Sequence, residues 1–372
     1  MDFNELGINP IFIKALKKQG ITTPTQVQEK VIPKLFNGAD LIVQSETGSG
    51  KSLAFLLPLL QSIDVGDKTT QALIIVPTRE LALQISNVAE SFAALAGIDV
   101  LSLYGGKRTS DQIKKIKLKK QVIVATPGRL IDHVMQDRIC LSTIKFLVLD
   151  EADQLLLAGF NSEIEKIISE IPGNRQTIFI SATMPSNIKK FAYRYTYEPE
   201  FIMINHRNLY KKDIAQFVIP TTDRQKFPAL NKVLLEDNPY LAIIFCRTKR
   251  RADELQAKMK KYKFDSDVIH SDISQNKRER ILNKFKKGDL QFLIATDVAA
   301  RGLDINYITH IYNFDIPESV ETYVHRIGRT GRAGESGFSY TFTTPDDEQN
   351  VNEIENTLQQ QITRRLVSIG GK

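Results

Sequence analysis

The stretch LIVQSETGSGKS, residues 41–52, decides how the chain is expected to fold. Four residues typical of a buried strand lead into a loop with two glycines, and an apolar helical segment follows from Lys51. On both sides of it, short apolar runs alternate with helical segments such as residues 80–96, which Gly97 ends. Continuous apolar strands between amphipathic helices indicate a parallel sheet covered on both faces.

This alternation occurs twice along the chain. Six apolar runs precede a polar, aperiodic segment, NHRNLYKKD at residues 205–213, and five more follow it. We therefore predict two α/β domains, residues 1–205 and 214–372, joined by a linker at residues 206–213. Each domain is expected to hold a mostly parallel sheet with helices on both faces.

The composition is that of an ordinary globular protein, 42% hydrophobic and 25% charged over 372 residues. Its two cysteines show no pairing logic, and its longest apolar run, residues 53–60, is too short to cross a membrane. The N-terminus is acidic and is not a signal peptide. We expect a cytoplasmic protein with no membrane partner.

The net charge of +7 is spread over both halves. Residues 1–205 contain 23 Lys and Arg against 21 Asp and Glu, and residues 206–372 contain 27 against 22. An excess of +2 and +5 permits a nucleic-acid partner without requiring one.

Residues 45–52 have the composition of a phosphate-binding loop. Glycines let backbone N–H groups turn toward phosphate oxygens at a helix N-terminus, Lys51 adds positive charge, and the Ser52 hydroxyl can ligate Mg²⁺. The alternative is a glycine-rich turn that merely contains lysine, but the preceding strand and following helix favour nucleotide binding. The residues expected to bind ATP here are Ser45, Glu46, Thr47, Gly48, Ser49, Gly50, Lys51 and Ser52.

A second motif, FLVLDEAD at residues 146–153, places acids at the end of a strand. Asp150 would lie beside the phosphate loop and hold Mg²⁺, partly through water. Glu151 would orient or deprotonate the attacking water. The alternative, carboxylates that only complement a helix dipole, is weaker beside a phosphate loop.

The sequence resembles the DEAD-box RNA helicases of helicase superfamily two. DEAD itself stands at residues 150–153, and the motifs occur in the family's order nearly end to end: GITTPTQVQ, PTREL, GG, TPGR, SAT, ATDVAARGLD and HRIGRTGR. The resemblance implies two tandem RecA-like domains and an RNA-stimulated ATPase that uses ATP and Mg²⁺. It also indicates a core-only member of bacterial type.

For the nucleotide base, the resemblance implies that Gln28 of GITTPTQVQ bonds both edges of adenine and that Phe3 stacks on it. A glutamine amide donates and accepts at once, which suits adenine. Without the resemblance, an exposed helical glutamine is the simpler interpretation. Gln26 departs from the family by replacing a common proline. By the same resemblance, Gly302 and Asp304 would contact the ribose.

HRIGRTGR, residues 325–332, belongs to the second half, which has no phosphate loop of its own. Its arginines make sense if the anion they meet is held by the first half, so Arg329 and Arg332 would reach the γ-phosphate of ATP. By the same resemblance, His325 would connect the phosphate site with the acidic motif. The alternative is a surface salt-bridge network, which leaves the two glycines unexplained.

The remaining motifs are assigned by resemblance. Ser181 and Thr183 of SAT would hydrogen-bond to Asp153 and couple hydrolysis to strand separation, although SAT alone is typical of a helix cap. Backbone, hydroxyl and arginine contacts to phosphates and sugars would bind RNA with little sequence specificity. The expected RNA-binding residues are Arg79, Gly105, Gly106, Thr126, Gly128, Arg129, Thr248, Arg278, Thr296 and Asp297.

These observations predict an ATP-dependent RNA helicase that clamps single-stranded RNA between two domains and melts short duplexes. RNA is the expected partner, with ribosomal or ribonucleoprotein partners as a further possibility, and the protein is expected to be a monomer. Two alternatives stay open: an RNA clamp or scaffold with little turnover, and a DNA-acting superfamily-two ATPase.

Overall fold

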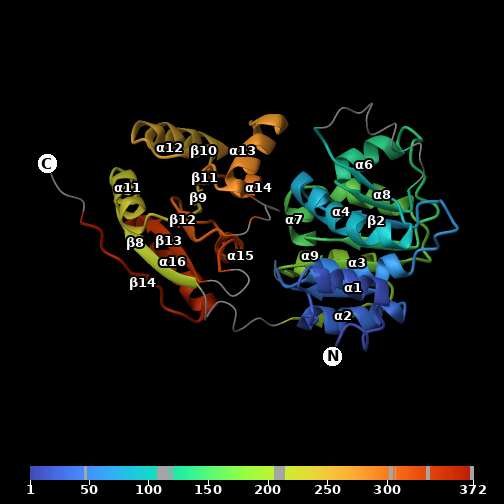
Figure 1. Ribbon diagram of the computed structural model, residues 1–372. Helices are drawn as coiled ribbons and strands as arrows, with labels where there is room; N and C mark the ends of the chain where they lie inside the picture. The colour runs from blue at the N-terminus through green and yellow to red at the C-terminus, as the bar shows by residue number, and fades with distance from the viewer. Residues whose placement is uncertain are drawn as a thin grey trace. The chain divides into compact units, whose positions relative to one another are not determined.

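The chain forms two units, Met1–Asn205 and His206–Lys372, each with its own sheet and core. The computed structural model describes residues 1–45, 48–106, 116, 120–204, 214–300, 305, 307–331 and 336–368 (Figure 1). The predicted linker, residues 206–213, lies outside the described residues. In the part that is described, no helix is long and apolar enough to cross a membrane.

The first unit has a seven-stranded sheet in the order β3-β4-β2-β5-β6-β1-β7, and its described pairings are all parallel. Its strands are β1 (Leu41–Gln44), β2 (Ala72–Ile75), β3 (Val100–Leu103), β4 (Val122–Ala125), β5 (Phe146–Leu149), β6 (Gln176–Ser181) and β7 (Glu200–Met203). Its helices are α1 (Pro10–Lys18), α2 (Gln26–Phe36), α3 (Lys51–Gln61), α4 (Arg79–Ala93), α6 (Pro127–Val134), α7 (Ala152–Leu157), α8 (Asn161–Ser169) and α9 (Ser186–Arg194), with a short 3₁₀ turn at Ala94–Ala96.

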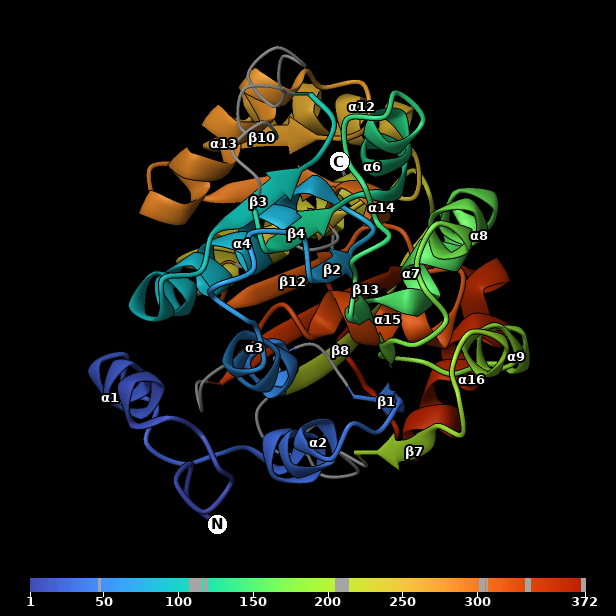
Figure 2. The ribbon, with the colours of Figure 1, turned by 90° about the vertical axis from the view of Figure 1, so that its right-hand side faces the viewer.

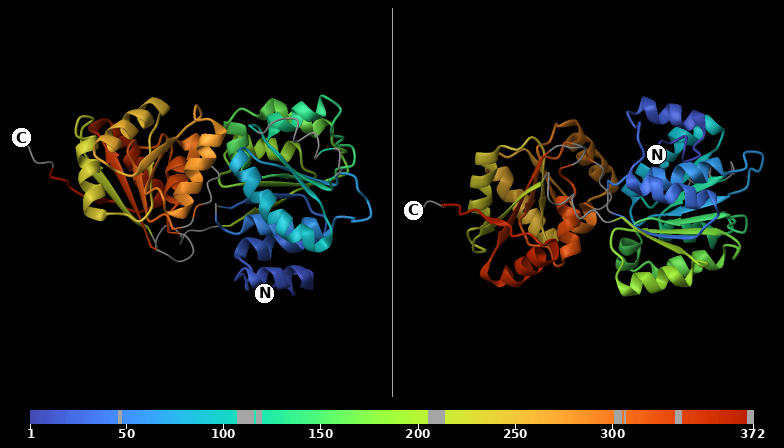
Figure 3. Two further views of the ribbon diagram at one scale, coloured as in Figure 1. Left: turned by 45° about the horizontal axis from the view of Figure 1, so that its top comes forward. Right: turned by 90° about the horizontal axis from the view of Figure 1, so that it is seen from below.

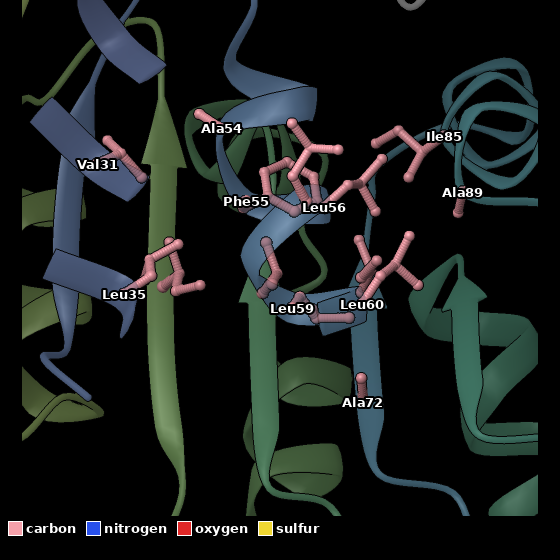
Figure 4. Close-up of a cluster of buried hydrophobic side chains, with 14 of the residues drawn as sticks. Val31, Leu35, Ala54, Phe55, Leu56, Leu59, Leu60, Ala72, Ile85 and Ala89 are labelled. Atoms are coloured by element: carbon pink, nitrogen blue, oxygen red, sulfur yellow. The ribbon is translucent and has the colours of Figure 1, made fainter. Parts of the chain in front are cut away.

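Helices cover both faces of this sheet. Helices α1 to α4 pack on one hydrophobic cluster and α6 to α9 on another, on opposite sides of the strands (Figure 2). Successive strand residues face opposite clusters, so Ile74 and Leu73 of β2 are both buried but on different sides. Figure 4 shows Leu56 and Leu60 of α3 on the side of Ile85 of α4, with Val31 and Leu35 of α2 on the other side of α3. Burying each such leucine contributes about 1.5–3 kcal/mol.

The second unit repeats the arrangement with the order β10-β11-β9-β12-β13-β8-β14, again parallel in its described pairings. Its strands are β8 (Ile214–Pro220), β9 (Ala242–Phe245), β10 (Ser266–Ile269), β11 (Phe292–Ala295), β12 (His310–Asn313), β13 (Gly337–Thr343) and β14 (Thr363–Arg364). Its helices are α11 (Lys226–Asp237), α12 (Lys249–Lys261), α13 (Gln275–Lys287), α14 (Asp297–Ala300), α15 (Val320–Ile327) and α16 (Glu348–Leu358), with a 3₁₀ turn at Pro345–Asp347.

Helices also cover both faces of the second sheet (Figure 3). Helices α11 and α12 share one hydrophobic cluster, α13 and α14 share the opposite one, and α15 and α16 pack on a third. The prediction of two α/β domains with sheets covered on both faces is confirmed. Because the strands of each sheet are parallel, their carboxyl ends lie along one edge, where open α/β sheets bind ligands.

Candidate functional site

The phosphate loop joins β1 to the N-terminus of α3, as the sequence predicts. Gly50, the N-cap of α3, has φ +88° and Gly48 has φ +83°, a region that favours glycine. A Cβ on Gly50 would lie 2.8 Å from Gln28 Nε2 and 2.9 Å from Thr25 Oγ1. Glycine is therefore required at residue 50 both by the backbone turn and by the close approach of α2.

Ser45 fixes the start of the loop. Its hydroxyl donates to Ser49 Oγ at 2.8 Å, and its backbone N–H donates to the Ser181 carbonyl at 2.9 Å. The serine that departs from the usual motif thus makes a hydrogen bond that Gly or Ala could not make. Glu46 and Thr47, two predicted ATP contacts, lie outside the described residues.

Lys51 and Asp150 face each other in the interior. Their Nζ and Oδ1 atoms are 3.7 Å apart, and the residues are 6% and 1% exposed. Burial raises the pKa of the Asp150 carboxyl, while the charge of Lys51 acts to lower it. Among the described residues, neither Lys51 Nζ nor Asp150 Oδ2 has a hydrogen-bond partner.

Buried charged atoms without hydrogen bonds cost free energy unless a ligand satisfies them. An ammonium group suits phosphate oxygens, and a carboxylate oxygen suits Mg²⁺. No group of three potential metal ligands occurs in the described parts of the chain. Proteins usually bind Mg²⁺ through one or two carboxylates plus substrate phosphates and water. The residues at this position therefore fit a nucleotide phosphate with Mg²⁺.

Glu151 has a backbone conformation that non-glycine residues rarely adopt. Its φ is +51°, its backbone N–H donates to Asp150 Oδ1 at 2.9 Å, and it is 7% exposed. Left-handed backbone at such a residue costs free energy and clusters at functional sites. The turn sets Glu151 at the start of α7, directly after the predicted magnesium ligand.

The contact expected between Asp153 and SAT is present. Thr183 Oγ1 and its backbone N–H donate to Asp153 Oδ2 at 2.9 and 3.2 Å, and the Asp153 N–H donates to Ser181 Oγ at 3.1 Å. Since the Ser181 carbonyl also accepts from Ser45, one set of hydrogen bonds connects the acidic motif, SAT and the phosphate loop.

Gln28 is buried, 1% exposed, so the interpretation as an exposed helical glutamine is wrong. Its Oε1 accepts from the Thr25 N–H at 2.9 Å and its Nε2 donates to the Gly50 carbonyl at 3.0 Å. An amide has two N–H groups and two lone pairs, so one donor and one acceptor position remain beyond these two bonds. That pair is what the predicted adenine contact needs.

Phe3 is placed differently from what base stacking requires. Its side chain is 2% exposed and belongs to the cluster that α1 and α2 share with the sheet. Little of the ring is open to a base in this conformation.

The predicted RNA-binding residues of the first unit follow three neighbouring strands. Arg79 begins α4 after β2, Gly105 and Gly106 follow β3, and Thr126 is the N-cap of α6 after β4. A Cβ on Gly105 would lie 2.8 Å from Arg79 Nη2, so the PTREL and GG motifs are in contact. Gly128 and Arg129 form the first turn of α6.

The sheet order divides the carboxyl edge of the first unit into two parts. Strands β3, β4 and β2 lead to the predicted RNA-binding residues, and β5, β6 and β1 lead to the acidic motif, SAT and the phosphate loop. Each half of the edge therefore serves one predicted ligand, and the two halves adjoin at β2 and β5.

The predicted RNA-binding residues of the second unit also gather at its carboxyl edge. Thr248 follows β9 and caps α12, accepting from the Arg251 N–H, while Thr296 and Asp297 follow the neighbouring β11. Arg278 Nη2 donates to the Ala299 carbonyl at 2.6 Å, which places the first turns of α13 beside α14.

The sequence-based assignment missed Arg326 of HRIGRTGR. This arginine is 2% exposed, and its Nε and Nη2 donate to Asp297 Oδ1 and Oδ2 at 2.6 and 2.7 Å. Its Nη1 donates to Asn313 Oδ1 and the Asp315 carbonyl, and its guanidinium lies 5.0 Å from the Phe245 ring centroid. For this one arginine the salt-bridge interpretation is correct, although its guanidinium is buried and only Asp297 is partly exposed.

Both oxygens of Asp297, a predicted RNA contact, are thus held by Arg326. A signal for Arg326 existed in the sequence, since Tyr323 and Ile327 on the same face of α15 are apolar and buried.

The other predicted residues of this motif lie close by. His325 and Arg329 line a small pocket together with Asp297 and Phe245, and Arg329 is 7% exposed. Arg332, Gly302 and Asp304, which carry the predicted γ-phosphate and ribose contacts, lie outside the described residues.

Each unit is an α/β domain with a parallel sheet. The first has a phosphate loop and an acidic motif, and the second has an arginine motif. Together these features define a helicase core. The helicase family described as DEAD/DEAH box matches residues 25–191, and the helicase conserved C-terminal domain matches residues 225–334.

Comparison with known proteins identifies the family further. The chain is 43% identical to the DEAD-box ATP-dependent RNA helicase CshA of Geobacillus kaustophilus over 97% of this chain and 78% of that protein. It is 44% identical to CshA of Listeria monocytogenes over 95% of this chain and 68% of that protein. The chain therefore belongs to the DEAD-box family of ATP-dependent RNA helicases.

Solved structures of the same family are also similar. Yeast Dbp5 bound to RNA and ADP BeF3 has a TM-score of 0.89 at 28% identity, covering 98% of this chain and 95% of that one. Mss116p bound to single-stranded RNA and AMP-PNP has a TM-score of 0.85 at 28% identity, covering 98% and 78%. These neighbours support the tandem RecA-like fold.

Proposed function

We propose that this protein is an ATP-gated clamp on single-stranded RNA that melts short neighbouring duplexes. The buried pair Lys51 and Asp150 carries the proposal, because Lys51 Nζ and Asp150 Oδ2 make no hydrogen bond among the described residues and a ligand would supply one. A nucleoside triphosphate would supply phosphate oxygens for the ammonium group of Lys51. Mg²⁺, held by Ser52 and Asp150 partly through water, would neutralise phosphate charge.

In this proposal, Glu151 orients the attacking water and Arg329 and Arg332 stabilise the charge that develops on the γ-phosphate. ATP and RNA each contact both units, so both ligands favour the same closed state. Hydrolysis removes the group that the arginines hold, and the clamp opens.

Coupling between the two ligands has a physical route within the first unit. Asp153, Ser181 and Ser45 are connected by hydrogen bonds, and β2 of the RNA half of the edge is paired with β5 of the nucleotide half. A change at the phosphate loop therefore acts on groups bonded to the acidic motif, next to the strand that leads to Arg79.

We propose that the bound RNA is single-stranded, and the structure of Mss116p with single-stranded RNA supports this. We propose RNA rather than DNA as the substrate, because the CshA relatives are RNA helicases. We further propose that the protein acts in the cytoplasm as a monomer and assists ribosome assembly or the remodelling of other ribonucleoproteins. Crosslinking in cells followed by sequencing of the bound RNA tests that setting.

The clamp itself is tested by RNA affinity in different nucleotide states. A non-hydrolysable ATP analogue should tighten binding of single-stranded RNA, and ADP should loosen it. Equal affinity in both states contradicts the clamp. An ATPase assay with and without RNA then separates the helicase from a scaffold with little turnover, which would show no RNA stimulation.

A further inference from the structure

The positive charge of the second unit is concentrated on α12 and α13. These helices together contain 12 Lys and Arg against 3 Asp and Glu, a net charge of +9. Residues 206–372 as a whole contain 27 against 22, a net +5, so the remainder carries a net −4. The two helices flank the edge strand β10, one on each face of the sheet (Figure 1).

The three cations at the start of α12 differ in their partners from the exposed cations of α13. Three at the start of α12 are paired: Lys249 with Asp272 at 2.9 Å, Arg250 with Glu254 at 2.9 Å, and Arg251 with Asp315 at 2.6 Å. Five exposed cations of α13 have no ion-pair partner within the described part of the chain: Lys277, Arg280, Lys284, Lys286 and Lys287. The single acid of α13, Glu279, accepts from Gln275 at 2.9 Å.

The outer face of α13 is also hollowed. Arg280, Lys284 and Lys287, spaced at i, i+4 and i+7, line a groove with the amides of Asn276 and Asn283. Glu279 and Asp289 border the same groove. The apolar residues of the helix are turned inward, since Ile281, Leu282 and Phe285 are buried. A face of cations and amides suits phosphates and sugars, and it lacks the exposed apolar residues that an amphipathic helix inserts into a membrane.

The position of α13 connects this groove with the predicted RNA site. Arg278 in its first turns is bonded to Ala299, just beyond Thr296 and Asp297. As the connection between the parallel strands β10 and β11, α13 then runs away from the carboxyl edge for about 20 Å. RNA that leaves the motif residues on this side would meet the row of cations.

We propose that the outer face of α13 is a second RNA-binding surface, which holds the phosphate backbone of RNA extending beyond the strand bound by the motif residues. The inference rests on the proposed RNA function and adds to it. It predicts that affinity rises with RNA length and that this added affinity is sensitive to salt, because it comes from phosphate contacts.

The test uses the full chain with the triple substitution Arg280→Gln, Lys284→Gln and Lys287→Gln. These residues are exposed and Gln is a good helix former, so the helix should be kept. The matched control is Lys14→Gln, Lys17→Gln and Lys18→Gln on exposed positions of α1, which removes the same charge from the first unit. Three RNAs are compared with an ATP analogue over a salt series: a short strand, that strand with a single-stranded flank, and that strand with a duplex flank.

The wild type should bind at least one flanked RNA more tightly than the short strand. The α13 variant should lose that gain, and the slope of log affinity against log salt should fall by about 2 for the flanked RNA. Its affinity for the short strand and its ATPase rate with that strand should not change. The proposal is overturned if the variant binds flanked RNA as the wild type does, in which case an acidic protein surface fits these cations better.

The proposal is also overturned if the α1 control loses as much affinity for flanked RNA as the α13 variant does. The same holds if the α13 variant binds the short strand more weakly by the same factor as it binds flanked RNA. Failure of the proposed function looks different. In that case the wild type would bind the short strand with the same affinity in every nucleotide state, whatever happens on α13.

Discussion

Two buried charged sites, one in each unit, are bonded in opposite ways. In the first, Lys51 Nζ and Asp150 Oδ2 have no hydrogen-bond partner among the described residues, although both residues are less than a tenth exposed. In the second, the guanidinium of Arg326 makes four hydrogen bonds to Asp297, Asn313 and Asp315. A buried charge with satisfied donors holds a scaffold together, whereas one left unsatisfied indicates where a charged ligand binds.

This comparison also separates arginines within one motif. Arg326 connects the ends of β9, β11 and β12 through Phe245, Asp297 and the Asn313 and Asp315 acceptors, while Arg329 lines the adjacent pocket. Mutations should therefore divide into those that lose turnover and those that lose stability.

The largest effect is expected for Arg332→Ala. If Arg332 stabilises charge on the transferred phosphate, hydrolysis should fall by roughly 10³ or more, about 4 kcal/mol. ATP affinity, measured with a fluorescent analogue, should survive because the phosphate loop and Gln28 remain. RNA affinity in the presence of a non-hydrolysable ATP analogue should fall. Turnover within a few-fold of wild type at saturating ATP and RNA would show that Arg332, like Arg326, has a structural role and no role in hydrolysis.

Arg326→Ala should instead lower the free energy of unfolding, by about 2–4 kcal/mol, because it leaves the buried Asn313 and Asp315 acceptors without a donor and the partly exposed Asp297 carboxylate without its partner. Arg326→Lys should recover only part of this, since lysine lacks the planar fork that binds both oxygens. Denaturant unfolding of the full chain measures the loss. Arg250→Ala is the matched control, because its bond to Glu254 is exposed and should contribute little. If Arg326→Ala and Arg250→Ala had the same free energy of unfolding, the stabilising role of Arg326 would be contradicted.

Lys51→Ala should reduce ATP affinity by roughly 10- to 150-fold, the equivalent of one hydrogen bond to a charged group of about 1.5–3 kcal/mol. Binding and turnover should fall together, unlike in Arg332→Ala. The loss of stability should be smaller than for Arg326→Ala, because the Asp150 carboxyl, with its raised pKa, can take up a proton. Isothermal titration with ATP and a parallel unfolding curve provide both quantities. Normal RNA-stimulated turnover would remove the nucleotide assignment.

The sequence predicted those features that depend on neighbouring residues. The phosphate loop lies between β1 and α3, and Asp150 follows β5, because strand, loop and helix signals are local. The roles of Gln28, Ser181, Thr183 and the RNA-binding residues depended on family resemblance, whereas those of Lys51 and Asp150 followed from the local motifs.

Contacts between distant segments were not predictable. The burial of Gln28 against Gly50, the packing of Arg79 on Gly105, and the pairing of Arg326 with Asp297 each join segments at least 20 residues apart. The uneven distribution of charge was missed for another reason. The sequence analysis counted charge over the whole second half, where the excess is mild, and this concealed the net charge of +9 on α12 and α13. Counting charge by helix would have shown it.

The smallest effect is expected for Gln28, a buried amide that uses only half of its hydrogen-bonding positions. It tests whether an unsatisfied buried polar group indicates a ligand site. Gln28→Ala removes the donor and the acceptor together, and it also breaks the bonds to Thr25 and Gly50. Gln28→Glu is the sharper variant, since a carboxylate can still accept from the Thr25 N–H but cannot donate to Gly50 or to adenine.

If the unused donor and acceptor recognise adenine, Gln28→Ala should narrow the preference for ATP over GTP by up to about tenfold, the value of one neutral hydrogen bond, because it loses the acceptor that distinguishes the adenine amino group from the guanine carbonyl oxygen. Gln28→Glu keeps an acceptor, so it should weaken ATP binding and retain the preference for ATP. ADP affinity should fall with ATP affinity, because the base is common to both. Competition titrations with ATP, ADP and GTP measure this. Should the wild type already bind and hydrolyse GTP as well as ATP, Gln28 would belong with Arg326, as a buried polar group that holds the end of α2 against the phosphate loop and recognises nothing.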